Sequence, residues 1–130
     1  AGLMAAGTAA KGGASVALLE KNEIFGKKLS ITGGGRCNIT NAEYDTHKFL
    51  DNFGDAAKFL HSPFSQFNVK STFTFFERLG LPLVIEARKR TFPKSQKASD
   101  VLNALVSYAS KNGVQFKTGV SARKFMVEEG

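Results

Sequence analysis

Residues 31–41, ITGGGRCNITN, place three consecutive glycines directly before an arginine, the only cysteine of the chain and an asparagine. Such a run is costly to order, because glycine loses more backbone freedom on folding than any other residue. From Gly33 to Gly35 side chains are missing, so backbone N–H groups could come close to a flat or anionic ligand. Arg36 adds a fixed positive charge suited to pyrophosphate, and Asn38 can donate and accept at the edge of a heterocycle. The segment predicts a ligand-binding loop.

Other interpretations of this loop stay open. It could be a loose surface connector in which Arg36 makes an ordinary ion pair. Cys37 could be a redox thiol, but the chain has no second cysteine to form the CxxC pair of disulfide reductases. We therefore expect Cys37 to be a small buried residue that packs near the ligand.

Gly2 and Glu20 form a second candidate pair. In a dinucleotide-binding βαβ unit, a glycine fingerprint opens the helix, and an acid about 20 residues further on accepts hydrogen bonds from ribose hydroxyls. Gly2 precedes an alanine-rich stretch, and Glu20 closes the apolar segment SVALLE. The spacing predicts a nucleotide site. The alternative, in which Gly2 is only a terminal residue and Glu20 a solvated strand end, stays open.

The elements around this pair are typical of half a βαβ unit. Residues 3–11 predict a helix of small residues that stops at Gly12 and Gly13. Residues 15–20 are a short apolar run, as expected of a strand buried on both faces of a parallel sheet. Because the preceding strand of the unit is absent, we expect the chain to be an N-terminally clipped piece of a longer protein.

The rest of the chain predicts a helical insertion followed by more strands and one more helix. Residues 46–79 carry apolar residues at helical spacing, and their phenylalanines are expected in a core rather than as a stacking platform for bases. Further elements are expected as follows: strands at 81–87 and 91–93, a helix reaching Asn112, a strand at 114–119, and an imperfectly alternating stretch at 120–130 that could be one more strand. The layout is α/β.

Composition narrows the class of protein. The chain has 130 residues, which suits one domain at most, and no apolar run approaches the roughly 20 residues of a membrane span. One cysteine fits a reducing compartment, so we expect a soluble, cytoplasmic protein. Two histidines and one cysteine make a dedicated zinc site improbable.

The net charge of +7 is unevenly distributed. Residues 86–97, EARKRTFPKSQK, hold five basic side chains and one acid, and such a patch attracts anions. An anion or nucleic-acid-binding module built on residues 88–97 is therefore a second functional hypothesis. A solvated basic surface is favoured over nucleic-acid binding, because no nucleic-acid motif accompanies the patch.

Three stretches resemble a known family. LLEKNEIFGKKLSITGGGRCNITN (residues 18–41), FFERLGLPL (75–83) and RTFPKSQKASDVLNAL (90–105) resemble bacterial NAD(P)/FAD-dependent oxidoreductases, the aminoacetone-oxidase-like or bile-acid-related flavoproteins. The resemblance covers nearly the whole chain, and members of the family are several times longer. It implies that residues 1–130 are part of a Rossmann-type FAD-binding domain, without its first strand and with a helical insertion, in a larger flavoprotein.

The resemblance also implies roles for individual residues. Gly2 would belong to the pyrophosphate turn, Glu20 would contact the adenosine ribose, and Lys21 follows it. Lys28 could face phosphate or serve solubility. The residues that would lie along the cofactor near its flavin end are Gly33, Gly34, Gly35, Arg36, Cys37 and Asn38. One position departs from the family pattern, since Lys89 stands where a glycine is common.

The implied activity is electron transfer between NAD(P)H and an unidentified small organic substrate through FAD. The negative charge of a reduced flavin would then be a second candidate partner for Arg36. Neither catalytic residues nor the oligomeric state can be assigned from this sequence. A third hypothesis is that residues 1–130 alone are a catalytically silent piece of such an enzyme.

Overall fold

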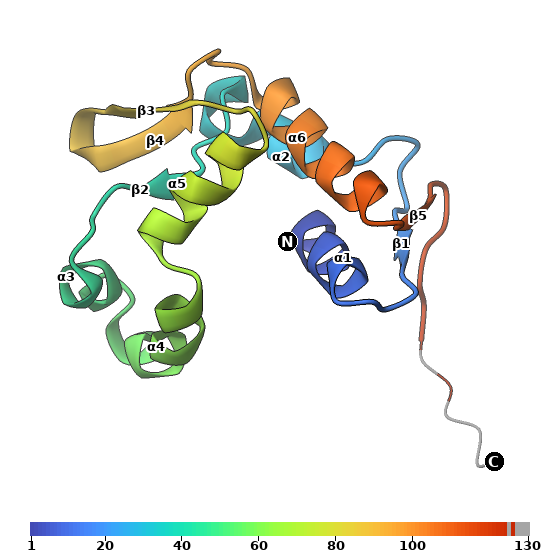
Figure 1. Ribbon diagram of the computed structural model, residues 1–130, viewed down its shortest axis with the longest axis horizontal. Helices are drawn as coiled ribbons and strands as arrows, with labels where there is room; N and C mark the ends of the chain where they lie inside the picture. The colour runs from blue at the N-terminus through green and yellow to red at the C-terminus, as the bar shows by residue number, and fades with distance from the viewer. Residues whose placement is uncertain (125, 127–130) are drawn as a thin grey trace. The chain divides into compact units, whose positions relative to one another are not determined.

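The computed structural model describes residues 1–124 and 126, which divide into two compact units. We name residues 1–27 with the described residues from 105 onward the terminal unit, and residues 28–104 the central unit. The helices, labelled in Figure 1, are α1 (Gly2–Lys11), α2 (Lys27–Ile31), α3 (Thr46–Asp51), α4 (Ala57–Gln66), α5 (Val69–Arg78) and α6 (Ala98–Lys111). The strands are β1 (Ala17–Leu19), β2 (Thr40–Asn41), β3 (Leu83–Glu86), β4 (Arg90–Pro93) and β5 (Gln115–Lys117). Short 3₁₀ turns lie at Thr32–Gly35, Gly54–Ala56 and Ala87–Lys89.

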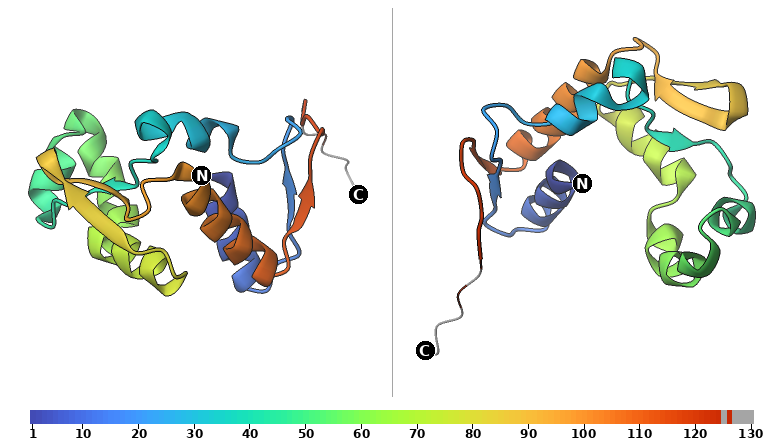
Figure 2. Two further views of the ribbon diagram at one scale, coloured as in Figure 1. Left: turned by 90° about the horizontal axis from the view of Figure 1, so that it is seen from above. Right: turned by 180° about the vertical axis from the view of Figure 1, so that it is seen from behind.

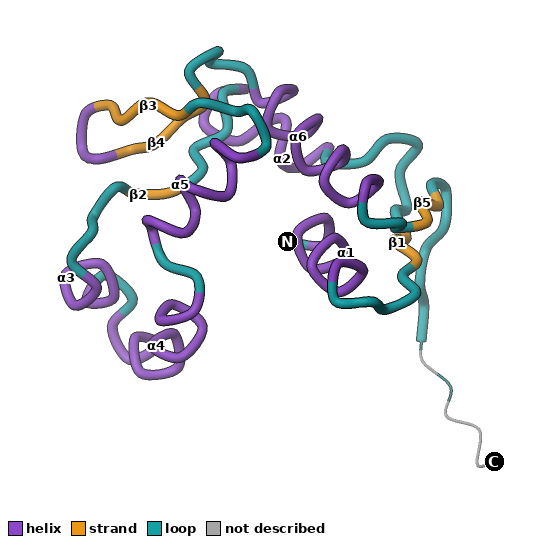
Figure 3. The backbone as a smooth tube through the Cα atoms, in the orientation of Figure 1, coloured by secondary structure: helices purple, strands orange, loops and turns teal. Residues whose placement is uncertain are grey.

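In the terminal unit, two strands that are far apart in the sequence pair in parallel. β1 lies beside β5 (Figure 2), with Ala17 opposite Gln115 and Leu19 opposite Lys117. Helix α1 ends before Gly13, whose φ of +93° is the left-handed turn that glycine adopts without strain. Helices and strands follow one another along the chain (Figure 3), and together with the parallel pairing this confirms the predicted α/β class.

The prediction that β1 is buried on both faces was wrong for the described residues. Leu19 is 44% exposed, and only Leu18 of this strand is half-buried. The physical reason is that β1 has a single neighbouring strand among the residues that the structure describes. A parallel strand is buried when layers cover both of its faces, which one neighbour cannot provide.

The contact between α1 and the second half of α6 depends on a glycine. A Cβ built on Gly7 would lie 2.5 Å from Cε1 of Tyr108 and 3.3 Å from Cα of Ala109. Gly2, at the first position of the same helix, would place its Cβ at 3.4 Å from Leu18 Cδ1, which is an ordinary contact. Gly7 therefore allows the two helices to pack closely, a role that the sequence assigned to no residue.

Gly7→Ala is expected to lower the free energy of unfolding by about 1 to 2 kcal/mol, because overpacking outweighs the gain in helix propensity. Gly2→Ala is the matched control in the same helix, and we expect no loss of stability there. Urea unfolding of the complete protein, followed by circular dichroism, measures both variants. Equal stability of the two would contradict the packing role of Gly7.

In the central unit, three strands form an antiparallel sheet in the order β2-β4-β3. Strand β4 lies in the middle and carries Thr91 and Phe92, which are 0% and 1% exposed. The structure confirms the strands predicted at 81–87 and 91–93. The edge strand β2 was not predicted, because two residues are too few for a recognisable alternation.

The helical insertion consists of α3, α4 and α5, and its aromatic core is smaller than predicted. Phe76 is buried and the rings of Phe49 and Phe64 stack at 4.5 Å. Phe53 and Phe67, however, are 46% and 42% exposed. Helical spacing identifies residues that share a face, but it does not establish that another element covers that face.

Helix α6 and the strand after it match their predictions. Val101 and Ala109 of α6 are buried, as predicted for its apolar face, and β5 falls within the expected stretch 114–119. Of the further strand proposed at 120–130, residues 125 and 127–130 lie outside the described residues, and 120–124 form no strand. None of the described helices has the length and apolar character needed to cross a membrane.

Candidate functional site

The predicted site residues fall into two groups. Gly2, Glu20 and Lys21 belong to the terminal unit, whereas Lys28 and the segment 33–38 belong to the central unit. The surroundings of these residues are defined within each unit separately.

Glu20 lies directly after β1, where the strand ends. Its Oε1 accepts hydrogen bonds from the backbone N–H of Asn22 at 2.9 Å and from Asn22 Nδ2 at 2.6 Å. The backbone hydrogen bond from Asn22 is the main reason that the pKa of Glu20 is lowered from 4.5. An ionised carboxylate has about four acceptor sites on its two oxygens, so Glu20 keeps the capacity to accept from a ligand hydroxyl.

The other members of the terminal group are less constrained. Gly2 is the first residue of α1, so it lies at the helix end where backbone N–H groups have no partner within the helix. Lys21 is exposed, as is Lys28 in α2, and neither makes an ion pair with the described residues. Nothing in their surroundings distinguishes phosphate contacts from solubilising side chains.

The three glycines of the central group all adopt left-handed backbone. Their φ angles are +57° for Gly33, +65° for Gly34 and +81° for Gly35. Only glycine takes this conformation without steric cost, which explains why the run consists of glycine. Cys37 also has a positive φ, +61°, so the chain turns left-handed again two residues later.

The glycines differ in what a side chain would meet. A Cβ on Gly33 would lie 2.9 Å from the backbone nitrogen of Asn38 and 3.1 Å from Cε1 of Phe92, so the space there is used by the chain itself. A Cβ on Gly34 would meet nothing within 4 Å, and Gly34 is exposed. Within this loop, Gly34 is the most open backbone position, and Gly35, whose Cβ would lie 4.0 Å from the Ser30 carbonyl oxygen, is nearly as open.

Backbone donors in the loop are partly used. The N–H groups of Arg36 and Cys37 both donate to the carbonyl of Thr32, Cys37 at 3.0 Å. These two donors are therefore not directed to an external ligand. The expectation that backbone N–H groups bind a ligand here is limited to the glycines.

Arg36 is held by several partners within the central unit. Its Nη1 donates to Glu86 Oε2 at 3.0 Å and to Gln96 Oε1 at 3.1 Å, and its Nε donates to the Gly33 carbonyl at 3.3 Å. The guanidinium carbon lies 4.0 Å from the centre of the Phe92 ring, within cation–π range. The ion pair that the sequence left as an alternative for Arg36 is thus present.

Asn38 and Cys37 fix the far side of the loop. With its amide oriented so that nitrogen faces two carbonyls, Asn38 donates to Thr40 at 3.0 Å and to Thr91 at 3.1 Å. These bonds tie the loop to β2 and β4. Cys37 is buried, which confirms the expected burial, and that burial raises the pKa of its thiol above the ordinary value. A protonated thiol is a weak nucleophile and a poor redox centre at neutral pH.

The basic hairpin between β3 and β4 has glycine-like backbone without glycine. Arg88 and Lys89 have φ of +60° and +58°, the left-handed region that favours glycine. Lys89 pairs with Glu43. Arg88, Lys89, Arg90, Lys94 and Lys97 are all exposed. The turn geometry that glycine favours is therefore retained despite Lys89.

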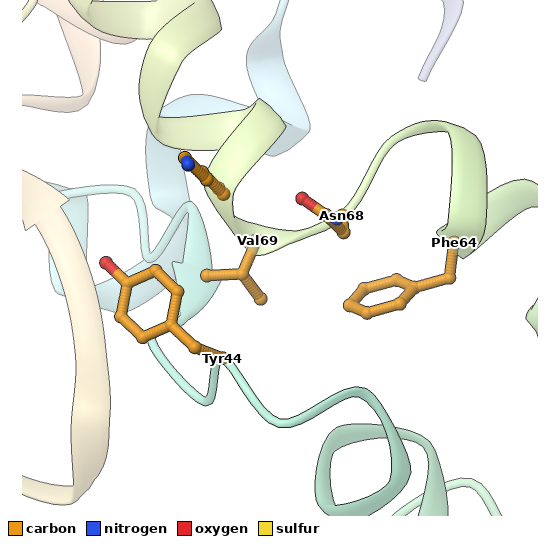
Figure 4. Close-up of a pocket in the computed structure, with 5 residues that line it drawn as sticks. Tyr44, Phe64, Asn68 and Val69 are labelled. Atoms are coloured by element: carbon orange, nitrogen blue, oxygen red, sulfur yellow. The ribbon is translucent and has the colours of Figure 1, made fainter.

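One pocket in the central unit is lined by none of the predicted site residues. It has a volume of about 210 Å³ and is lined by Tyr44, Phe64, Asn68, Val69 and Lys70 (Figure 4). One polar atom of its lining is already used, because Asn68 Oδ1 accepts from the N–H of Ser71 at the start of α5. No group of three or more His, Cys, Asp or Glu able to hold a metal occurs among the described residues.

The donor set suits FAD at both predicted positions. Glu20 offers a carboxylate held by Asn22 that can still accept from a ribose hydroxyl. Gly34 offers exposed backbone without a Cβ, as the close approach of a flat ring requires. Sequence reasoning missed Glu86, Gln96 and Phe92, which surround Arg36, because they lie more than 45 residues from it.

Comparison with known proteins matched a family model and a curated reductase. The model of the HI0933-like protein Rossmann domain matches residues 1–130. A 3-dehydro-bile acid delta(4,6)-reductase from Clostridium scindens is 36% identical over 121 residues. That match covers 92% of this chain but 29% of the reductase, so the chain spans under a third of the length of its curated relative.

Proposed function

The chain belongs to the HI0933-like Rossmann family, a family of bacterial flavoprotein oxidoreductases, and from this premise we propose that it binds FAD. The proposal extends to the complete protein, which would transfer electrons from NAD(P)H to a small organic substrate. The name of the C. scindens relative supports a reductase, but its bile-acid substrate is not carried over, because the match covers 29% of that protein.

The observation that carries the proposal is the environment of Gly34. The backbone there is exposed and free of side-chain obstruction, and it is held by neighbours that are themselves fixed. Asn38 ties the loop to the sheet, and Phe92, 1% exposed, supports Arg36. A preorganised, side-chain-free edge of this kind suits the flat ring of a flavin.

Each residue has a distinct role in the proposed site. Bound FAD would supply the electron-transfer chemistry. Glu20 would accept hydrogen bonds from the ribose, and the helix N-terminus at Gly2 would bind the pyrophosphate. Gly34 would leave room for the flat ring, and Arg36 would supply a fixed guanidinium. Cys37 takes no redox part, because burial keeps its thiol protonated.

The experiment that tests this function uses the complete protein purified without added cofactor. We expect a yellow protein whose flavin absorbance is released as FAD on denaturation, and whose flavin band bleaches with NADH or NADPH in the absence of oxygen. A colourless protein that takes up no added FAD would contradict the proposal.

A second function is supported by the exposed basic side chains of the β3–β4 hairpin and the residues after it, 88–97. They would bind nucleic acid through phosphate contacts whose strength falls steeply with salt. Retention of RNA by the complete protein, lost between low and high salt, would support this function. Arg88→Ala with Lys89→Ala should then reduce that retention and leave FAD content unchanged.

A further inference from the structure

The guanidinium of Arg36 is part of a closed polar triangle. Arg36 Nη1 donates to both carboxylate oxygens of Glu86, at 3.2 and 3.0 Å, and to Gln96 Oε1 at 3.1 Å. Gln96 Nε2 in turn donates to Glu86 Oε1 at 3.0 Å. Each of the three side chains is thus bonded to the other two, so none can rotate without breaking bonds to both partners.

A rigid aromatic platform completes the support. The ring of Phe92, 1% exposed, lies 4.0 Å from the guanidinium carbon. Arg36 Nε also donates to the carbonyl of Gly33, the residue next to the open position Gly34. The guanidinium is therefore fixed relative to the glycine loop by contacts from β3, β4 and the segment before α6.

The main effect of these contacts is not on the stability of the fold. The side chains of Arg36 and Glu86 are 36% and 31% exposed, and an ion pair of this exposure contributes little stability. What the triangle does provide is orientation and charge compensation. Arg36 Nη2 makes no hydrogen bond to the described residues and remains a donor, while Glu86 cancels the net charge of the group.

We propose that Glu86 and Gln96 are positioning residues of the flavin site, and that Glu86 sets the net charge beside the flavin through Arg36. This inference rests on the proposed FAD function. An orienting partner that cancels the arginine charge leaves a hydrogen-bond donor but little positive potential. The loop then favours a neutral ring over free anions, and it stabilises added electrons on the flavin less than an unpaired arginine would.

The substitution Glu86→Gln tests the effect of the Glu86 charge alone. Glutamine keeps an acceptor oxygen for Arg36 and Gln96 but removes the negative charge, so the +1 charge of Arg36 is no longer compensated. We expect the midpoint potential of the bound flavin to shift to more positive values, with the FAD dissociation constant changed by less than about threefold. Glu86→Asp keeps the charge and is the matched control, whose potential should stay close to that of the wild type.

Glu86→Ala tests the positioning role. It removes the acceptor as well as the charge, so Arg36 loses its ionic partner and keeps only its weaker contacts, and we expect FAD to bind about tenfold more weakly. In the Arg36→Met background the same Glu86→Ala change should have little further effect on FAD affinity, because both residues act as one unit. Dye-coupled reduction measures the potential, and flavin fluorescence titration measures the affinity.

The outcomes separate this inference from the function on which it rests. If the wild-type protein takes up no FAD, the proposed function fails. If it binds FAD but Glu86→Gln leaves the midpoint potential unchanged, or if Arg36→Met and Glu86→Ala weaken FAD additively, the positioning role of Glu86 is wrong. A positive shift in Glu86→Gln with rescue in Glu86→Asp supports it.

Discussion

Gly33→Ala is expected to lower the free energy of unfolding by about 3 kcal/mol, the largest stability effect of any single methyl group in the candidate site. Two costs combine at this position. The φ of +57° is unfavourable for any residue with a Cβ, and the new methyl group would lie 2.9 Å from the Asn38 nitrogen and 3.1 Å from the Phe92 ring. Phe92 cannot move aside easily, because it is 1% exposed in the middle strand of the sheet.

Gly34→Ala is the matched control for this prediction. It has a similar φ of +65° but open space around the position, so only the conformational cost of about 1 kcal/mol should remain. Urea unfolding of the complete protein, monitored by circular dichroism, compares the two. Equal losses in both variants would show that the close approach at Gly33 does not exist in solution.

Glu20→Ala is expected to weaken FAD binding by about ten- to a hundredfold, as removal of a charged hydrogen-bond acceptor does. Glu20→Gln should lose less, because an amide oxygen still accepts from Asn22 and from a ribose hydroxyl. The backbone N–H of Asn22 holds the carboxylate in place, which makes the loss specific to this residue. Isothermal titration of the flavin-free complete protein with FAD measures the three affinities.

The pKa of Glu20 predicts how this binding depends on pH. Hydrogen bonds from Asn22 lower that pKa below its ordinary value, so the carboxylate is ionised near neutral pH. A group whose pKa is depressed in the folded state contributes favourable free energy at pH values above its unfolded-state pKa. This contribution is lost as the pH falls through the folded-state pKa. The Glu20 contribution to FAD affinity should therefore be constant between about pH 5 and pH 8. A decline within that window that disappears in Glu20→Gln would contradict the assignment.

Local patterns in the sequence predicted much of the fold. The alanine-rich helix, the short apolar strand after it and the amphipathic helix at 98–111 each follow from residue spacing and glycine stops, which act within a few residues. The parallel pairing of β1 with β5 was not predicted, because the two strands lie far apart in the sequence.

Features that depend on distant contacts could not be predicted in this way. Gly7 differs from Gly2 only because Tyr108 lies against it, a hundred residues further along the chain. The partners of Arg36 come from β3 and from the turn before α6. Likewise, the exposure of Phe53 depends on whether another element covers it, which helical spacing does not encode.

The candidate site also has features that local sequence predicted and features that depend on distant contacts. Residue type and order identified the glycine loop, the carboxylate after β1 and the buried cysteine. They did not show that Gly33 serves the packing of the chain while Gly34 remains open, since both have the same residue type and similar φ. Only the positions of Asn38 and Phe92 separate the two roles.

The central claim is that this chain contributes two contacts to FAD binding, one from Glu20 to the ribose and one from Gly34 to the flavin ring. The most direct test measures the binding of ADP, riboflavin and FAD to Glu20→Ala and Gly34→Val in the complete, flavin-free protein. We expect Glu20→Ala to weaken ADP but not riboflavin, Gly34→Val to weaken riboflavin but not ADP, and both to weaken FAD by at least about tenfold. Wild-type affinity for FAD in both variants, or the loss of the same half-ligand in both, would contradict the claim.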